Sequence, residues 1–170
     1  MAFLLIEDIR VGQPIYVYIW EGSKIASIFP NPSYGEGYLG IKKKSGSSPW
    51  LGVKRYVQDF DPLVFEIAAK TDDGRFGLRS RDTGKLVTHR GDWVYADGDR
   101  YDEYIATPVA KINEEQVYKL VAHTNLIWSP RLVFDTNFTS ISAWNCNEDD
   151  DINSDQRGYE AYVSFRSAAA

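Results

Sequence analysis

Apolar and polar residues alternate with a period of two along several short stretches of this chain, as expected of half-buried β-strands. Four of these stretches resemble one another, and each contains an aromatic residue: IYVYI at 15–19, VFEIA at 64–68, VYKLV at 117–121 and EAYVSF at 160–165. They recur at roughly fifty-residue spacing, which is typical of propellers, solenoids and other repeated architectures. Three intervals between four strands predict three units whose last strand closes against the first, as in a β-trefoil.

The predicted fold is all-β, with a single β-trefoil domain over residues 1–170 and units at roughly 13–63, 64–116 and 117–166. The segment KINEEQVYKLVAH at 111–123 is the one candidate helix, but its apolar residues fit the start of a strand equally well. The residues expected in the core are Ile15, Val17, Phe65, Ile67, Leu78, Val94, Ala96, Leu120, Val133 and Val163.

The middle unit has the clearest pattern of strands and turns. Its TDDG sequence is a turn that ends in a glycine, Gly74, at the position where a positive φ is needed, and RDTG is predicted as a second turn. In the strand DWVYAD, alternation places Val94 and Ala96 on one face and Trp93 and Tyr95 on the other. We expect the small apolar pair inside a narrow barrel and the two aromatic residues either facing outward or lying under a loop.

Composition and charge narrow the range of functions. The chain has 170 residues, enough for one domain with a sizeable core. Its net charge of −5 argues against a nucleic-acid partner or an anionic membrane surface, because phosphate binding needs a basic face. The three lysines at 42–44 beside a Gly/Ser loop are interpreted as a solvated turn.

The expected location is a reducing, intracellular compartment, most simply the cytoplasm, with secretion by a non-classical route left open. Cys146 is the single cysteine, so the chain forms no intrachain disulfide. The short apolar run at 3–6 has no basic residue before it and is followed by acidic residues. It therefore predicts neither a signal peptide nor a membrane span.

Residues 60–98, FDPLVFEIAAKTDDGRFGLRSRDTGKLVTHRGDWVYADG, resemble the agglutinin domain of amaranthin-type plant lectins. The resemblance rests on the Asp-Pro-Leu lead-in, the Phe-Glu-Ile strand, the Asp-Gly turn and a Trp before a small residue. It implies a β-trefoil that binds galactose- or N-acetylgalactosamine-type glycans or glycoproteins without enzymatic activity. Because amaranthin-like lectins form sites between protomers, it also implies a possible homodimer.

Residues 131–160 are similar to one repeat of a ricin-type lectin trefoil. In that repeat an Asp, an aromatic residue and an Asn-Gln pair surround a sugar, and Asp135, Trp144 and Gln156 match those roles. The sequence departs from the pattern at Ser142, where a polar amide is usual, and in lacking the closing Gln-x-Trp. The resemblance again implies glycan binding.

The residues themselves also favour a sugar site. A sugar ring offers an apolar C–H face for an aromatic ring and hydroxyls for Asp, Asn or Gln, and the 92–97 and 135–147 segments contain both kinds of partner. The structural alternative is that the aromatic residues pack beneath a neighbouring loop. The expected ligand-binding residues are Asp92, Trp93, Tyr95, Asp97, Asp135, Trp144, Asn145 and Gln156.

No catalytic residue, metal site or cofactor is expected. His89 and His123 lie in separate units without ligand spacing, and the acidic run at 148–151 lacks the Gly of a calcium loop. No motif selects a pair of carboxylates for glycoside cleavage. The alternative function is a protein-binding trefoil, either a fascin-like cytoskeletal module or a protease inhibitor that presents the proline-stiffened loop SIFPNPSYGEGY at 27–38.

Overall fold

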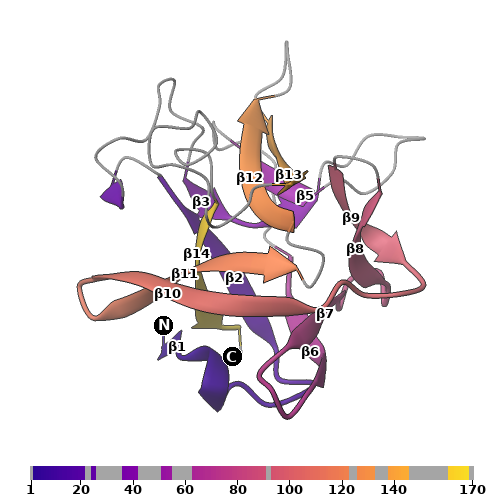
Figure 1. The fold of residues 1–170 in the computed structure, drawn as a ribbon, viewed down its shortest axis with the longest axis horizontal. Coiled ribbons are helices and arrows are strands. Elements are labelled where there is room, and N and C mark those ends of the chain that lie inside the picture. The colour runs from indigo at the N-terminus through magenta and orange to yellow at the C-terminus, as the bar shows by residue number, and fades with distance from the viewer. Residues whose placement is uncertain are drawn as a thin grey trace.

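A computed structural model describes residues 2–21, 24–25, 36–41, 51–54, 63–90, 93–122, 126–132, 138–145 and 161–168 (Figure 1). In some of these strands, including 126–132 and 138–145, the description covers the backbone alone. The elements are β1 (Phe3–Leu4), the short 3₁₀ helix η1 (Ile6–Asp8), β2 (Ile15–Trp20), β3 (Gly37–Tyr38), β4 (Gly40–Ile41), β5 (Leu51–Lys54), β6 (Phe65–Lys70), β7 (Phe76–Ser80), β8 (Leu86–Arg90), β9 (Trp93–Gly98), β10 (Tyr104–Ile112), β11 (Glu115–Ala122), β12 (Leu126–Leu132), β13 (Phe138–Asn145) and β14 (Tyr162–Ser167).

The all-β prediction is confirmed, because the described residues contain strands and no α-helix. In the segment 111–123, for which a helix was the alternative, residues 111–122 instead form the tip of the β10–β11 hairpin and its returning strand. Asn113 and Glu114 form the turn, with φ of 48° and 71°. Two successive positive φ values are characteristic of the type I′ turns that suit the twist of a hairpin. No helix in the described part of the chain is long and apolar enough to cross a membrane.

Six strands follow one another in a partial ring. Its order is β2, β6, β7, β10, β11 and β14, and every neighbouring pair is antiparallel. The pairing of β14 with β2 is continuous from Tyr162 opposite Trp20 to Ser167 opposite Ile15, so the last strand closes against the first long one, as predicted. The four stretches that look alike in the sequence give β2, β6, β11 and β14, which are adjacent in this ring. They share one pattern because each turns one face toward the same core.

Three hairpins lie outside the ring: β4–β5, β8–β9 and β12–β13. They meet one another, because β13 pairs with both β5 and β9 and β5 also contacts β9. In Figure 1, β5, β12 and β13 are seen together at the upper end of the molecule, with β8 and β9 to one side. Consecutive ring strands are therefore linked either by a tight turn or by one of these hairpins.

The core fills the ring and continues under the β8–β9 hairpin. In β2, Ile15, Val17 and Ile19 are buried while the residues between them are half-buried, which is the alternation the sequence predicts. Val94 and Ala96 are fully buried in the same cluster, as expected of the inward side of their strand, although β9 belongs to a hairpin and is not one of the six strands of the ring. Nine of the ten predicted core residues are buried, and Val133 lies outside the described residues.

Local turns and the two ends of the chain complete the architecture. Gly74 and Gly84 have φ of +86° and +70°, which confirms the two predicted glycine turns.

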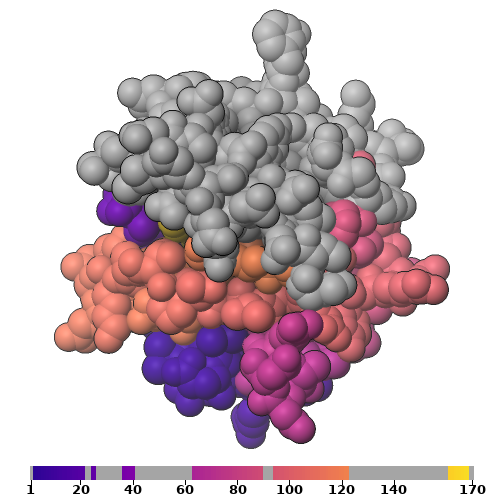
Figure 2. Space-filling model, viewed as in Figure 1, coloured from indigo at the N-terminus to yellow at the C-terminus, as the bar shows by residue number. Residues whose placement is uncertain are grey.

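The termini lie together, and the Ser167 amide donates to the carbonyl of Ala2 at 2.9 Å (Figure 1). The N-terminal residues also lie beside the β6–β7 hairpin (Figure 2), where Lys70 donates to the carbonyl of Ile6 at 3.2 Å.

Candidate functional site

The outer face of β2 carries three large aromatic side chains. Because Ile15, Val17 and Ile19 point into the core, the alternation directs Tyr16, Tyr18 and Trp20 away from it. All three remain half-buried, because side chains of neighbouring elements pack around them. The register brings Tyr38 of β3 opposite Tyr18 on one side, and Ser164 and Arg166 of β14 opposite Tyr18 and Tyr16 on the other. We call Tyr16, Tyr18, Trp20, Tyr38 and Arg166 the aromatic face.

The rings of the aromatic face meet edge to face. Tyr38 lies between Tyr16 and Tyr18 with its ring centroid 5.2 Å from each, and Tyr18 lies 5.0 Å from Trp20. The planes of these pairs are inclined at 61°, 80° and 73°, respectively. Edge-to-face pairs at this separation are favourable because the positive ring edge meets the negative ring face. The cluster is therefore a packed surface with ring edges and faces pointing in several directions.

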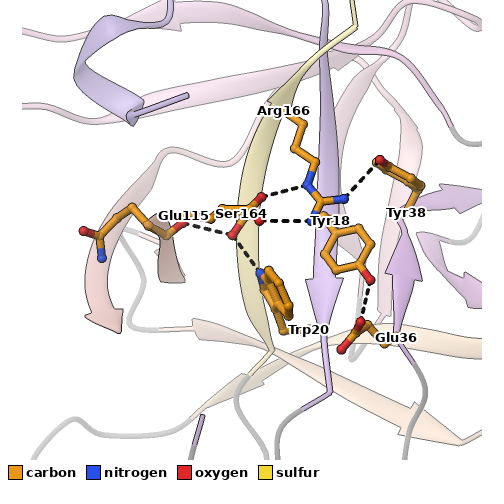
Figure 3. Close-up of polar contacts among 8 residues, drawn as sticks. Tyr18, Trp20, Glu36, Tyr38, Glu115, Ser164 and Arg166 are labelled. Atoms are coloured by element: carbon orange, nitrogen blue, oxygen red, sulfur yellow. Dashed lines mark hydrogen bonds and ion pairs between the residues drawn. The ribbon is translucent and has the colours of Figure 1, made fainter. Parts of the chain in front are cut away.

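Arg166 lies at the centre of this face (Figure 3). Its guanidinium carbon is 3.8 Å from the Tyr18 ring centroid, within cation–π range. Its Nε and one terminal nitrogen donate to the two carboxylate oxygens of Glu115 at 2.7 and 3.0 Å, and the other terminal nitrogen donates to the Tyr38 hydroxyl at 3.1 Å. Burial would lower the pKa of Arg166, but the bonds to Glu115 and Tyr38 outweigh burial and raise it. The guanidinium is therefore permanently charged and held in one orientation.

Glu36 forms a second polar centre at the edge of the face (Figure 3). Its carboxylate accepts hydrogen bonds from the Tyr18 hydroxyl at 2.5 Å and the Glu21 amide at 3.1 Å, and it pairs with Lys24 at 2.9 Å. Burial would raise the pKa of Glu36, but the bonds from Tyr18 and Lys24 outweigh it, so the pKa is lowered. Burial and the bond to Glu36 both raise the pKa of Tyr18. Tyr18 is therefore a neutral donor and Glu36 an anionic acceptor at neutral pH.

Ser164 connects the aromatic face to the β11 strand. Its hydroxyl accepts from the Trp20 indole nitrogen at 2.7 Å and donates to the carbonyl of Gln116 at 2.9 Å. Trp20 also packs on a small apolar cluster outside the ring, whose buried members are Val117 and Tyr162. The face thus combines apolar ring surface with fixed donors and acceptors. These are the two features that recognition of a polyhydroxylated ligand requires.

A separate polar cluster surrounds the buried Asp102, which precedes β10. The same carboxylate oxygen accepts from the His89 amide at 2.9 Å and lies 2.8 Å from His89 Nδ1 and 3.2 Å from the Tyr104 hydroxyl. Thr88 adds a longer contact to the other oxygen at 3.4 Å. These bonds satisfy a carboxylate that the fold buries. Within the described residues, no group of three metal-ligating side chains comes together.

The predicted ligand residues of the middle unit lie on β9. Tyr95 and Asp97 are half-buried there, on the side opposite the buried Val94 and Ala96. Trp93 begins the strand, with its backbone opposite Ser142 of β13. Its side chain is not part of the description, and Asp92 lies outside the described residues. The Trp93 platform stays a prediction.

The predicted ligand residues of the last unit are described even less completely. Trp144 and Asn145 lie in β13, where the backbone pairs them with Ile127 and Leu126, and their side chains are not described. Asp135 and Gln156 lie outside the described residues. Backbone pairing of β9 with β13 places Trp93 opposite Ser142, two residues before Trp144. Several other features discussed above also lie outside the described residues: His123, Cys146, the lysines at 42–44, the acidic run at 148–151 and most of the loop at 27–38.

Sequence reasoning used IYVYI only as evidence for a strand and did not identify the aromatic face. A signal was present, because every outward position of 15–20 is aromatic, whereas a solvated strand face normally carries polar residues. Its polar members could not be found in this way. Glu36, Glu115 and Arg166 come from three segments far apart in the sequence and carry no common motif.

Comparisons with known proteins give partial matches to tRNA sulfurtransferases. Over 74 residues the chain is 39% identical to tRNA sulfurtransferase of Aliivibrio fischeri (strain ES114) and 38% identical to that of Aliivibrio salmonicida (strain LFI1238). Each match covers 39% of this chain and 15% of the relative, so the chain matches only a small part of those enzymes. No protein-family model and no solved structure matches.

Proposed function

We propose that this protein is a carbohydrate-binding protein without enzymatic activity, built on a β-trefoil, and that the aromatic face takes part in glycan binding. The observation that carries the proposal is the aromatic face itself, where half-buried rings surround the fixed guanidinium of Arg166 beside the carboxylate of Glu36. A sugar needs apolar contact for its C–H groups and directional partners for its hydroxyls.

The β-trefoil is supported by connectivity. A trefoil has a six-stranded barrel with three hairpins gathered at one end, and its chain passes from barrel to hairpin and back in each unit. The partial ring and the three mutually contacting hairpins have that order. On this proposal, the first two unit boundaries fall in the turns after Lys70 and Ile112, so that β6 ends the first unit and β10 ends the second.

Glycan array screening followed by calorimetric titration tests the function. We expect the wild-type protein to bind glycans, with galactose- and N-acetylgalactosamine-type ligands first among those to be tried. Tyr16→Ala removes an outward ring whose packing contact is with Tyr38, and should weaken binding by about tenfold, or about 1.4 kcal/mol. An array without any bound glycan would overturn the proposal.

Tyr95→Ala is the matched variant, because it removes a half-buried tyrosine from the outward side of β9. If Tyr95→Ala loses glycan binding and Tyr16→Ala retains it, the binding site lies at the predicted platform around Trp93 and not at the aromatic face. Thermal melting of each variant separates a binding defect from unfolding.

The other functions have weaker support. The tRNA sulfurtransferases that match this chain are far longer than the matched segment, and the acidic chain lacks the basic balance that RNA binding needs. A protease-inhibitor role depends on a loop that lies mostly outside the described residues. A pull-down from lysate, run beside the glycan array, would reveal a protein partner.

A further inference from the structure

We infer that the aromatic face selects uncharged oligosaccharides over sialylated or sulfated ones. This inference rests on the proposed function and names the ligand class of the same site. It follows from the charges at the described part of the face: Arg166 and Lys24 each have a carboxylate partner at contact distance, so neither cation is left unpaired for an anionic sugar.

The first pair is Arg166 with Glu115. The two side chains are 15% and 4% exposed and share two hydrogen bonds, so the carboxylate neutralises the guanidinium at contact distance. An anionic ligand that approached Arg166 would also approach Glu115. Bringing like charges together at an interface is costly, and it disfavours such a ligand.

The second pair is Lys24 with Glu36. Lys24 lies 5.9 Å from the Trp20 ring centroid and 2.9 Å from Glu36, which also accepts from Tyr18. Lys24 is 53% exposed and Glu36 22%, so both groups border the surface that a ligand would contact (Figure 3 shows Glu36). This pair again contributes one charge of each sign.

The next charged residues along the described parts of the neighbouring strands also have interaction partners. Glu21 follows β2 and Lys119 lies on β11, opposite Tyr162, and both have interaction partners. On β6, the other strand paired with β2, Glu66 pairs with both Arg79 and Arg81.

The remaining hydrogen-bonding capacity suits neutral hydroxyls. A guanidinium has five N–H groups, and three of those on Arg166 are used by Glu115 and Tyr38. The Tyr16 hydroxyl has no hydrogen bond to the described residues. A sugar hydroxyl both donates and accepts, so it can bond to these groups without introducing a charge.

The test is a titration of one neutral galactose-terminated oligosaccharide and of its sialylated and sulfated counterparts. We expect the neutral ligand to bind at least about tenfold more tightly than either anionic one. Its affinity should change little between low and high salt, because no net charge is neutralised on binding.

Glu36→Gln provides a second measurement. Gln keeps an acceptor for Tyr18 but leaves the charge of Lys24 unbalanced, so the ratio of anionic to neutral affinity should rise by about tenfold. Asp73→Asn is the matched control: it removes the carboxylate paired with Arg75 in the turn between β6 and β7, away from the aromatic face, and should leave that ratio unchanged. Tighter wild-type binding of the sialylated or sulfated ligand, or an unchanged ratio in Glu36→Gln, would overturn the inference and leave glycan binding intact. If none of the three ligands binds and the glycan array also shows no bound glycan, the proposed function itself is overturned.

Discussion

Removal of Glu115 from beneath the aromatic face should destabilise the fold strongly. Glu115→Ala takes away both oxygens that bind Arg166, and leaves a guanidinium that is only 15% exposed and that donates, among the described residues, to the Tyr38 hydroxyl alone. Breaking a buried ion pair by removing one partner typically costs about 3–5 kcal/mol, because the other charge stays buried without compensation. Glu115→Gln keeps one acceptor oxygen and should cost less, about 1–3 kcal/mol.

Urea unfolding, followed by tryptophan fluorescence and far-UV circular dichroism, measures both costs, with an unchanged m value as the check on two-state behaviour. The double variant Glu115→Leu/Arg166→Met removes both charges and should be more stable than Glu115→Ala. If Glu115→Ala costs less than about 1 kcal/mol, the pair behaves like a solvated surface pair and the burial argument is refuted.

Three further predictions follow from the described contacts. Leu78→Ala should cost about 2–5 kcal/mol in urea unfolding because the side chain is fully buried in the main cluster, and a cost near zero would contradict its place there. Glu114→Gly should raise thermal stability by up to about 1 kcal/mol, since Glu114 has φ of 71° and glycine adopts that region without strain; lower stability would show that the Glu114 side chain matters to the hairpin. Because folding lowers the pKa of Glu36, its carboxylate stabilises the fold fully above its ordinary pKa of about 4.3 and loses that effect as the pH falls through the folded-state pKa. Glu36→Gln should therefore remove part of the acid-induced loss of stability, and parallel stability–pH curves for the two proteins would contradict this.

Much of the fold could be predicted from local pattern. Ile15, Val17 and Ile19 alternate with outward residues, and a strand with that pattern can bury only one face. The glycine turns could also be predicted, because Gly74 occupies a conformation that other residues adopt only with strain. The segment at 111–123 could not be assigned in this way, because its apolar residues fit a helix or a strand equally well. Pairing of β11 with β10 and with β14 decides in favour of the strand.

Only the tertiary structure decided which strands become neighbours and which of their faces pack together. Alternation assigns Val94 and Ala96 to the buried side of β9, but it carries no information on whether that strand joins the six-stranded ring or a hairpin beside it. The same holds for the candidate site. The sequence by itself determined that Tyr16, Tyr18 and Trp20 share the outer side of one strand. The closure of β14 against β2 then brought Arg166 onto Tyr18, 148 positions later in the chain, because strand neighbours are selected by the packing of the whole core and not by local spacing.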